Sequence, residues 1–248
     1  MPQTYYAKFA IYLAARGFSV LTFDYRGIGR SRPAALRGFK ARMRDWAQLD
    51  AAAALEYMMT NVTATQTFHI GHSFGGQSLA MVPGGERYAA GLSVASQSGY
   101  WRNWPGVGRP AMWLLTHALL PGLSRLFGHF PMQALGQGED LPRDVAIEWA
   151  AWCRHPEYLV GHLGLHDNYA RFAAPLRFYW IEDDRYAPRA TVQALLDLYP
   201  NAPGELQTVS PAQHGGQRIG HFGFFRERYR DTLWRDAADW LLSHRSGA

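Results

Sequence analysis

The run Gly71-His72-Ser73-Phe74-Gly75 places a serine between two glycines. This G-x-S-x-G pattern is typical of a nucleophilic serine on a sharp turn between a strand and a helix. Gly71 and Gly75 would let the backbone pass without a Cβ in the way. An apolar run precedes the pattern and an Ala/Leu-containing helical segment follows it, as the turn requires. We therefore predict that Ser73 is a nucleophile and that the Phe74 N–H faces the developing oxyanion.

A serine hydroxyl is a weak nucleophile at neutral pH, so a carboxylate and a base are expected downstream. The apolar run 176–181 leads directly into Glu182, Asp183 and Asp184. Like charges repel, so the three carboxylates are not all expected to point into one site. We favour Asp184 over Asp183 because it opens a D-x-x-x-P turn in which Pro188 would start the next helix. A solvated acidic turn is the alternative interpretation.

The base is sought among ten histidines, two of which follow the last predicted strand. These are His214 and His221, and either could reach Ser73. His221 lies directly before the terminal helix in the run Gly220-His221-Phe222-Gly223, which suits a rigidly aimed side chain. His221 is therefore the preferred base.

Apolar runs, polar turns and helical patterns alternate along much of the chain, which predicts an α/β fold with a mostly parallel sheet flanked by helices. The expected strands are 18–23, 67–70, 89–95, 176–181 and 205–209. The expected helices are 6–15, 45–59, a segment through Ala80, 191–198 and a terminal amphipathic helix.

The alternation of apolar runs and helical patterns stops between residues 98 and 164. Tryptophan, proline and glycine are frequent in this span, and no strand pattern occurs. We interpret this span as a helical cap inserted into a core made of 1–97 and 165–248. Trp101, Trp104 and Trp149 either line an apolar acyl pocket or pack the cap itself.

Composition excludes several other classes of protein. The 248 residues carry a net charge of +5, but no nucleic-acid-binding motif accompanies it. Arg37, Lys40, Arg42 and Arg44 cluster in one loop and are interpreted as a solvated basic face rather than a site that steers anions. No run is long enough to span a membrane and no signal peptide is recognised, so a cytoplasmic location is expected.

Cofactor and metal sites are not expected. His162, His166 and Asp167 have helical spacing but lack a further ligand pattern. The Gly27 and Gly29 turn lacks the third glycine of a dinucleotide site. Cys153 is the single cysteine and is expected to be packed rather than reactive.

Four motifs in order resemble the α/β-hydrolase superfamily, near the uncharacterised bacterial group related to serine aminopeptidase-like (S33-type) esterases. They are 24–31 (DYRGIGRS), 71–76 (GHSFGG), 184–188 (DRYAP) and 220–223 (GHFG). The resemblance implies a Ser73–His221–Asp184 triad and a small-molecule carboxylic ester or thioester as substrate. Acyl transfer by the same triad, or a non-catalytic binding or scaffold role on the same fold, are the alternatives.

The resemblance also implies strands before residue 6 and a second oxyanion donor that precede Met1 in such proteins. The sequence is therefore expected to be truncated at its N-terminal side, with the first strands of the sheet missing.

Overall fold

Four parallel strands form the central sheet of the computed structural model, which describes residues 1–134, 136 and 138–245. The strands are β1 (Thr67–His72), β2 (Tyr88–Val94), β5 (Leu176–Ile181) and β6 (Gly204–Val209). Their order in the sheet is β1-β2-β5-β6, so β1 and β6 are its edges among the described residues.

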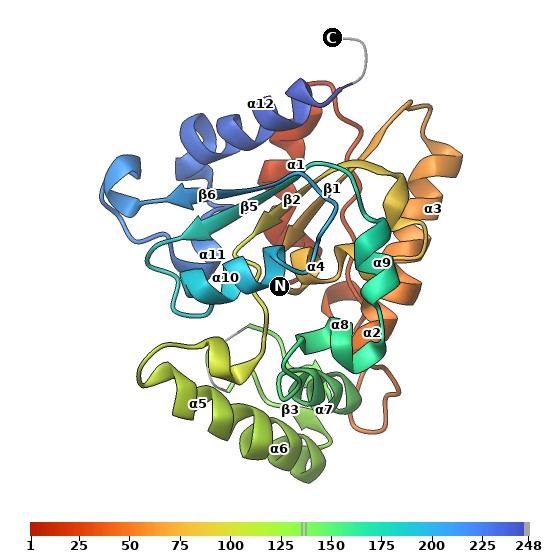
Figure 1. The fold of residues 1–248 in the computed structure, drawn as a ribbon. Helices are drawn as coiled ribbons and strands as arrows, with labels where there is room; N and C mark the ends of the chain where they lie inside the picture. The colour runs from red at the N-terminus through yellow and green to blue at the C-terminus, as the bar shows by residue number, and fades with distance from the viewer. Residues whose placement is uncertain (135, 137, 246–248) are drawn as a thin grey trace.

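Helices cover both faces of this sheet (Figure 1). Helices α1 (Ala7–Ala14) and α12 (Arg235–Ser243) pack on one face, whereas α3 (Ala52–Asn61), α9 (His166–Arg171) and α10 (Arg189–Leu196) pack on the other. Successive side chains of β5 point to opposite faces of the sheet and enter the apolar clusters on both faces. Phe178 belongs to one cluster and Tyr179 to the other.

The remaining elements are short or lie between β2 and β5. They are α2 (Met43–Asp45), α4 (Phe74–Gln77), α5 (Gly108–Leu114), α6 (Leu120–Phe127), α7 (Arg143–Trp152), α8 (Tyr158–Leu163), α11 (Gly220–Gly223) and the antiparallel pair β3 (His129–Phe130) and β4 (Leu141–Pro142). Helices α5 to α8 gather on the side of the molecule opposite α12 (Figure 1). Across the described ranges, no helix has the length and apolarity needed to cross a bilayer.

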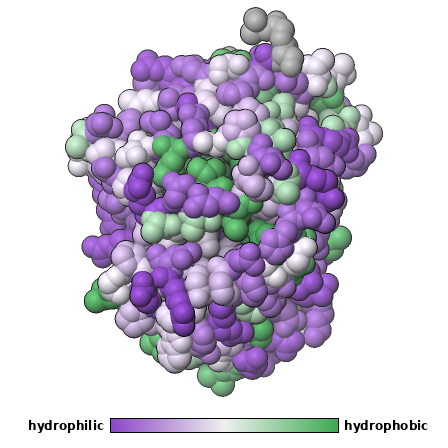
Figure 2. All heavy atoms as spheres, viewed as in Figure 1, coloured by the Kyte–Doolittle hydropathy of each residue, from purple (hydrophilic) through white to green (hydrophobic). Residues whose placement is uncertain are grey.

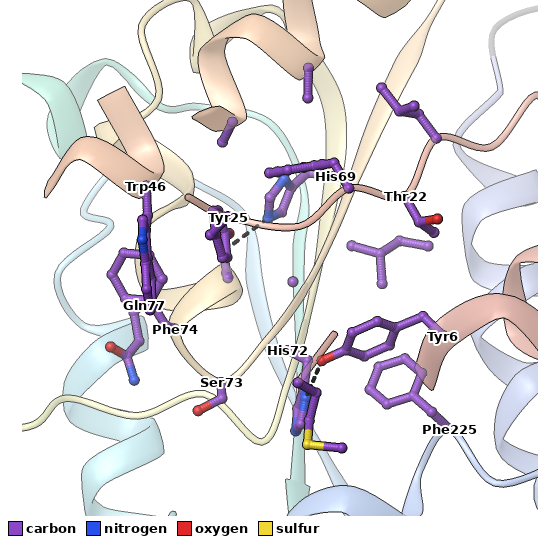
Figure 3. Close-up of a pocket in the computed structure, with 18 of the residues that line it drawn as sticks. Tyr6, Thr22, Tyr25, Trp46, His69, His72, Ser73, Phe74, Gln77 and Phe225 are labelled. Atoms are coloured by element: carbon purple, nitrogen blue, oxygen red, sulfur yellow. Dashed lines mark hydrogen bonds between the residues drawn. The ribbon is translucent and has the colours of Figure 1, made fainter. Parts of the chain in front are cut away.

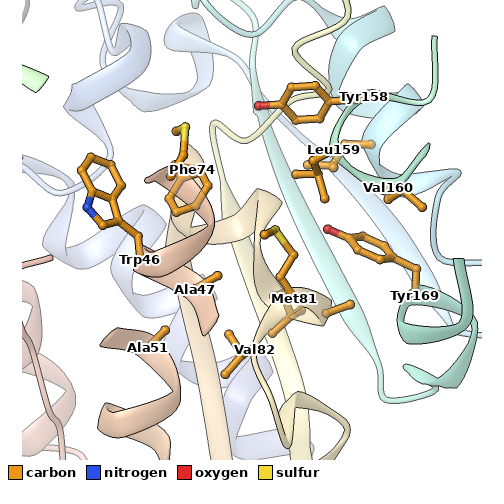
Figure 4. Packing of buried hydrophobic residues seen from close by; sticks show 14 of the residues in the cluster. Trp46, Ala47, Ala51, Phe74, Met81, Val82, Tyr158, Leu159, Val160 and Tyr169 are labelled. Atoms are coloured by element: carbon orange, nitrogen blue, oxygen red, sulfur yellow. The ribbon is translucent and has the colours of Figure 1, made fainter. Parts of the chain in front are cut away.

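Buried side chains of α7, α8 and α9 belong to one apolar cluster with residues of β2 and β5, and Figure 4 shows part of this cluster. The Tyr158 hydroxyl donates to Gln77 Oε1 at 2.8 Å, and the Tyr169 hydroxyl donates to the Gln77 carbonyl at 2.6 Å. Since buried polar groups are costly without partners, these bonds fix α8 and α9 against α4, the helix that follows Ser73.

Most predicted elements are present within a few residues of their expected positions. The strand predicted over 176–181 coincides with β5, and the strand predicted over 67–70 extends to His72 as β1. The helix predicted over 45–59 forms within a longer helical stretch, 43–61. The helix predicted to run through Ala80 is shorter, because α4 ends at Gln77 and a separate short turn, Leu79–Met81, follows.

The predicted strand over 18–23 is wrong. This run is irregular, and Val20 and Leu21 remain 39% and 37% exposed. A strand needs a neighbour to accept and donate its backbone hydrogen bonds. Among the described residues β1 pairs only with β2, and a cavity separates the open edge of β1 from 18–23. The apolar pattern of this run is correct for a strand, but the structure gives it no partner.

The span 98–164 was also expected to contain no strand, and the two-residue pair β3–β4 corrects that expectation. Where the structure describes this span, its other regular elements are helical.

Candidate active site

The turn that carries Ser73 is backbone-strained and crowded. Ser73 has φ +53° and ψ −117°, a positive-φ conformation that costs free energy in a residue with a Cβ. Its N–H donates to the Val94 carbonyl of β2 at 2.9 Å, which holds the turn at the end of the sheet. A Cβ at Gly71 would lie 2.3 Å from the Gly75 carbonyl carbon, so glycine is required there.

The second required glycine differs from the predicted one. A Cβ at Gly75 would meet nothing closer than 3.8 Å, whereas a Cβ at Gly76 would lie 2.0 Å from the Ser93 hydroxyl. Gly76 therefore allows α4 to approach β2. The sequence pattern contained Gly76, but only the packing shows that it matters more than Gly75.

Ser73, His221 and Asp184 form one hydrogen-bonded chain, although 148 residues separate the first two. The His221 Nε2 lies 3.0 Å from Ser73 Oγ, and His221 Nδ1 lies 2.8 Å from Asp184 Oδ2. The histidine and the aspartate are both buried, with His221 9% and Asp184 4% exposed. Because a carboxylate only accepts, Nδ1 carries the proton and Nε2 is left to accept from the serine hydroxyl.

Asp183, the alternative carboxylate, has a different role in the same loop. Its two oxygens accept the backbone N–H groups of Ile219 at 3.0 Å and Gly220 at 2.8 Å. Asp183 thus holds the chain immediately before His221, while Asp184 holds the His221 ring. Adjacent residues of one turn fix the same histidine in two ways.

His72 also contacts this loop, through the His221 carbonyl, and Figure 3 shows its hydrogen bond with Tyr6. Its Nε2 lies 2.8 Å from the His221 carbonyl, and its Nδ1 lies 2.9 Å from the Tyr6 hydroxyl. A carbonyl only accepts, so Nε2 carries the proton and Nδ1 accepts from Tyr6. Burial lowers the pKa of His72 well below its ordinary value, and the neighbouring His221 lowers it further. The His72 ring is therefore neutral at pH 7.

The Phe74 N–H is the first of helix α4, and the first N–H groups of a helix have no partner within it. Phe74 directly follows Ser73, so this N–H lies at the start of the helix that the Ser73 turn begins. That it binds the oxyanion stays a prediction.

A cavity of about 1520 Å³ opens at Ser73. Apolar side chains of the span 98–164 line part of it, among them Trp104, Met112, Leu115 and Trp149, and the 18–23 run and β1 line its other end. Hydrophobic atoms also show in a hollow across the middle of the molecule, between the sheet and the α5–α6 region (Figure 2). The site therefore faces an apolar volume large enough for an acyl group.

Two of the three tryptophans predicted to line the pocket do so, and the third does not. Trp104 and Trp149 line the cavity, and the Trp149 Nε1–H donates to the Tyr158 hydroxyl at 2.9 Å. Trp101 is not among the lining residues; it packs edge-on against His117. Trp101 is therefore not brought to Ser73.

The remaining candidates lie elsewhere. His214 stands in a short helical turn (Pro211–His214) beside Tyr229. No group of three metal-ligating side chains occurs in the part of the chain that the structure describes, which includes His162, His166 and Asp167. Cys153 is fully buried, and burial raises the pKa of its thiol.

Sequence reasoning missed Tyr6, the positioning contact of His72 and the backbone contacts of Asp183. His72 stands inside the serine motif, but nothing in the sequence shows that its ring reaches a carbonyl 149 residues away. Asp183 appeared only as a competitor for the role of Asp184.

Several solved structures have the same fold. A monoacylglycerol lipase from Paleococcus ferrophilus aligns with a TM-score of 0.63 at 15% identity, over 98% of this chain and 91% of its own. A thermophilic esterase from Thermogutta terrifontis gives 0.60 at 14% identity, over 99% and 87%. Est1E from Butyrivibrio proteoclasticus, solved with ferulic acid bound, gives 0.57 at 12% identity, over 97% and 82%.

No curated protein matches the sequence. The family model described as "Alpha/beta hydrolase family" matches residues 2–241, which is nearly the whole chain. With the fold and the arrangement around Ser73 described above, this match shows that the chain belongs to the alpha/beta hydrolase family.

Proposed function

We propose that this protein is a serine hydrolase that cleaves a carboxylic ester or thioester through an acyl-enzyme. The observation that carries the proposal is the hydrogen-bonded chain from Ser73 through His221 to Asp184, which ends at an apolar cavity. The esterases and lipase of similar fold support the same class of reaction.

In the first half of the reaction, Ser73 Oγ attacks the carbonyl carbon while His221 Nε2 takes its proton. The carbonyl oxygen becomes an oxyanion beside the Phe74 N–H, and one such donor contributes about 10²–10³ in kcat. Asp184 stabilises the imidazolium that forms and keeps Nδ1 protonated. His221 then gives its proton to the leaving alcohol or thiol as the bond to the carbonyl carbon breaks.

In the second half, water replaces the leaving group. His221 Nε2 takes a proton from the water, whose oxygen attacks the acyl carbon, and the returned proton restores the Ser73 hydroxyl as the acid leaves. We further propose that the span 98–164 acts as a cap over this step, with Trp104 and Trp149 in contact with an apolar acyl group.

The test is hydrolysis of p-nitrophenyl butyrate by the wild type, by Ser73→Ala and by Ser31→Ala, whose serine lies in an exposed turn. We expect Ser73→Ala to lose at least about 10³ in kcat and Ser31→Ala to retain activity. Hydrolysis that persists in Ser73→Ala would reject the proposal. A wild-type protein that binds the ester without hydrolysing it would favour the scaffold alternative.

A further inference from the structure

The outer face of the span 98–164 carries an exposed apolar stripe. Helices α5 and α6 join through a wider turn, Leu115–Leu119, into one helical run of roughly 30 Å. We define the outer stripe as its exposed apolar side chains together with those at its ends: Val107, Trp113, Leu114, Leu119, Leu126 and Phe127.

Exposure in this stripe is large. Val107 is 90% and Leu126 66% exposed, and six of the fourteen large apolar side chains exposed in the described structure belong to the stripe. Isolated exposed apolar residues need no explanation, but a gathering on one helical run marks an interaction surface.

Other residues of the same run face the proposed active site. Gly108, Met112 and Leu115 line the cavity that opens at Ser73, whereas Leu114 and Leu126 do not. The run therefore carries one apolar set that lines the cavity and another that stays exposed within the described structure. Exposed apolar side chains gathered on one run favour a further apolar partner outside the described residues.

Charge indicates what that environment is. No Asp or Glu occurs between residues 87 and 138, while Arg102, Arg109 and Arg125 flank the stripe and are exposed. None of these three arginines takes part in an ion pair between described residues. Exposed apolar side chains beside unpaired cations suit the acyl and headgroup regions of an anionic lipid surface.

The basic loop before α2 extends this cationic border. Arg37 lies against Gly128 at the end of α6, and Arg37 and Lys40 are exposed. Arg42 and Arg44, by contrast, are paired with Asp45 and Glu148. The loop thus divides into a paired half that holds the fold and an open half that adds charge beside the stripe.

We propose that the outer stripe and its arginines dock the protein onto an anionic lipid surface. Figure 1 shows α5 and α6 at the outer edge of the molecule, so the sheet would face away from the lipid. Docking would place the helices that line the cavity next to the surface. The contact itself depends on the stripe and the cations and not on the triad.

Sedimentation with vesicles tests the proposal, using phosphatidylcholine alone and a mixture with roughly one-third phosphatidylglycerol. We expect the wild type to bind the anionic vesicles, to bind pure phosphatidylcholine at least tenfold more weakly, and to be released by salt. The double variant Leu114→Ser/Leu126→Ser should bind at least tenfold more weakly. Ile11→Ser is the matched control, because Ile11 is 68% exposed on α1 and outside the stripe.

Hydrolysis of p-nitrophenyl butyrate by the same variants separates this proposal from the catalytic one, since we expect the Leu114/Leu126 variant to match the wild type. Failure of the wild type to bind anionic vesicles, or equal binding by the double variant, would overturn the docking proposal. A dimer by light scattering that the double variant dissociates would also overturn it, because a second copy would then cover the stripe.

Discussion

The substitution Asp184→Asn probes how the tautomer of His221 is set. Asp184 Oδ1 accepts the Tyr186 N–H at 2.8 Å, while Oδ2 accepts from His221 Nδ1 at 2.8 Å. An asparagine has one oxygen and one NH₂ group, so it can satisfy only one of these donors. If its oxygen stays on the Tyr186 N–H, its NH₂ group faces the imidazole.

That arrangement would move the proton of His221. Nδ1 must then accept, Nε2 becomes the protonated nitrogen, and the ring donates toward Ser73 Oγ at 3.0 Å instead of accepting from it. A histidine in this tautomer cannot take the serine proton. The same change in a Ser-His-Asp triad costs about 10⁴ in kcat, or about 5 kcal/mol of transition-state stabilisation.

The assay is kcat and KM for p-nitrophenyl butyrate, with Glu182→Gln as the control because Glu182 is exposed in the same turn. We expect Asp184→Asn to lose kcat about 10⁴-fold with little change in KM, and Glu182→Gln to keep the wild-type value. A loss of less than about tenfold in Asp184→Asn would refute the assignment of tautomers. An equal loss in Glu182→Gln would refute the assignment of the carboxylate.

Three further predictions concern the surroundings of the site. His72→Ala leaves the His221 carbonyl without its donor, so kcat should fall about tenfold at unchanged KM, and a change confined to KM would contradict a positioning role. Burial lowers the pKa of His69 to about 4, so the stability that its neutral ring contributes is lost as pH falls from 6.5 towards 4. Between pH 7.5 and pH 5, the free energy of unfolding in urea should therefore fall by about 2 kcal/mol less in His69→Gln than in the wild type. Equal losses in the two proteins would contradict this prediction. Burial also raises the pKa of Cys153, so its thiol should react with a disulfide reagent only after unfolding, and rapid labelling of the native protein would disprove this packing.

Local sequence patterns predicted the parts of the fold that depend on neighbouring residues. The apolar run 176–181 forms β5, which lies between two other strands. The G-x-S-x-G pattern predicted the Ser73 turn because its strain is local. The pairs Asp184–His221 and His221–Ser73 came together because the order of strands and loops determines where their ends meet.

Features for which neither a local pattern nor the resemblance gives a signal could not be predicted in this way. The run 18–23 has the composition of a strand, but a strand also needs a neighbouring strand to pair with. The sequence of the run does not reveal that a cavity, and not a strand, lies beside it. The sequence likewise ranked Asp183 below Asp184 without showing that its oxygens bind backbone groups 36 and 37 residues away. Trp101 and Trp104 look equivalent in sequence, and only the packing separates the one that lines the cavity.

The proposed reaction depends on Ser73 being an activated nucleophile. Peptide mapping by mass spectrometry after treatment with a fluorophosphonate tests it most directly, because the reagent reacts with serines that a neighbouring base activates. We expect one adduct, on the peptide that carries Ser73, and its loss in Ser73→Ala and in protein unfolded before labelling. An unlabelled native protein, or an adduct on any other residue, would contradict it.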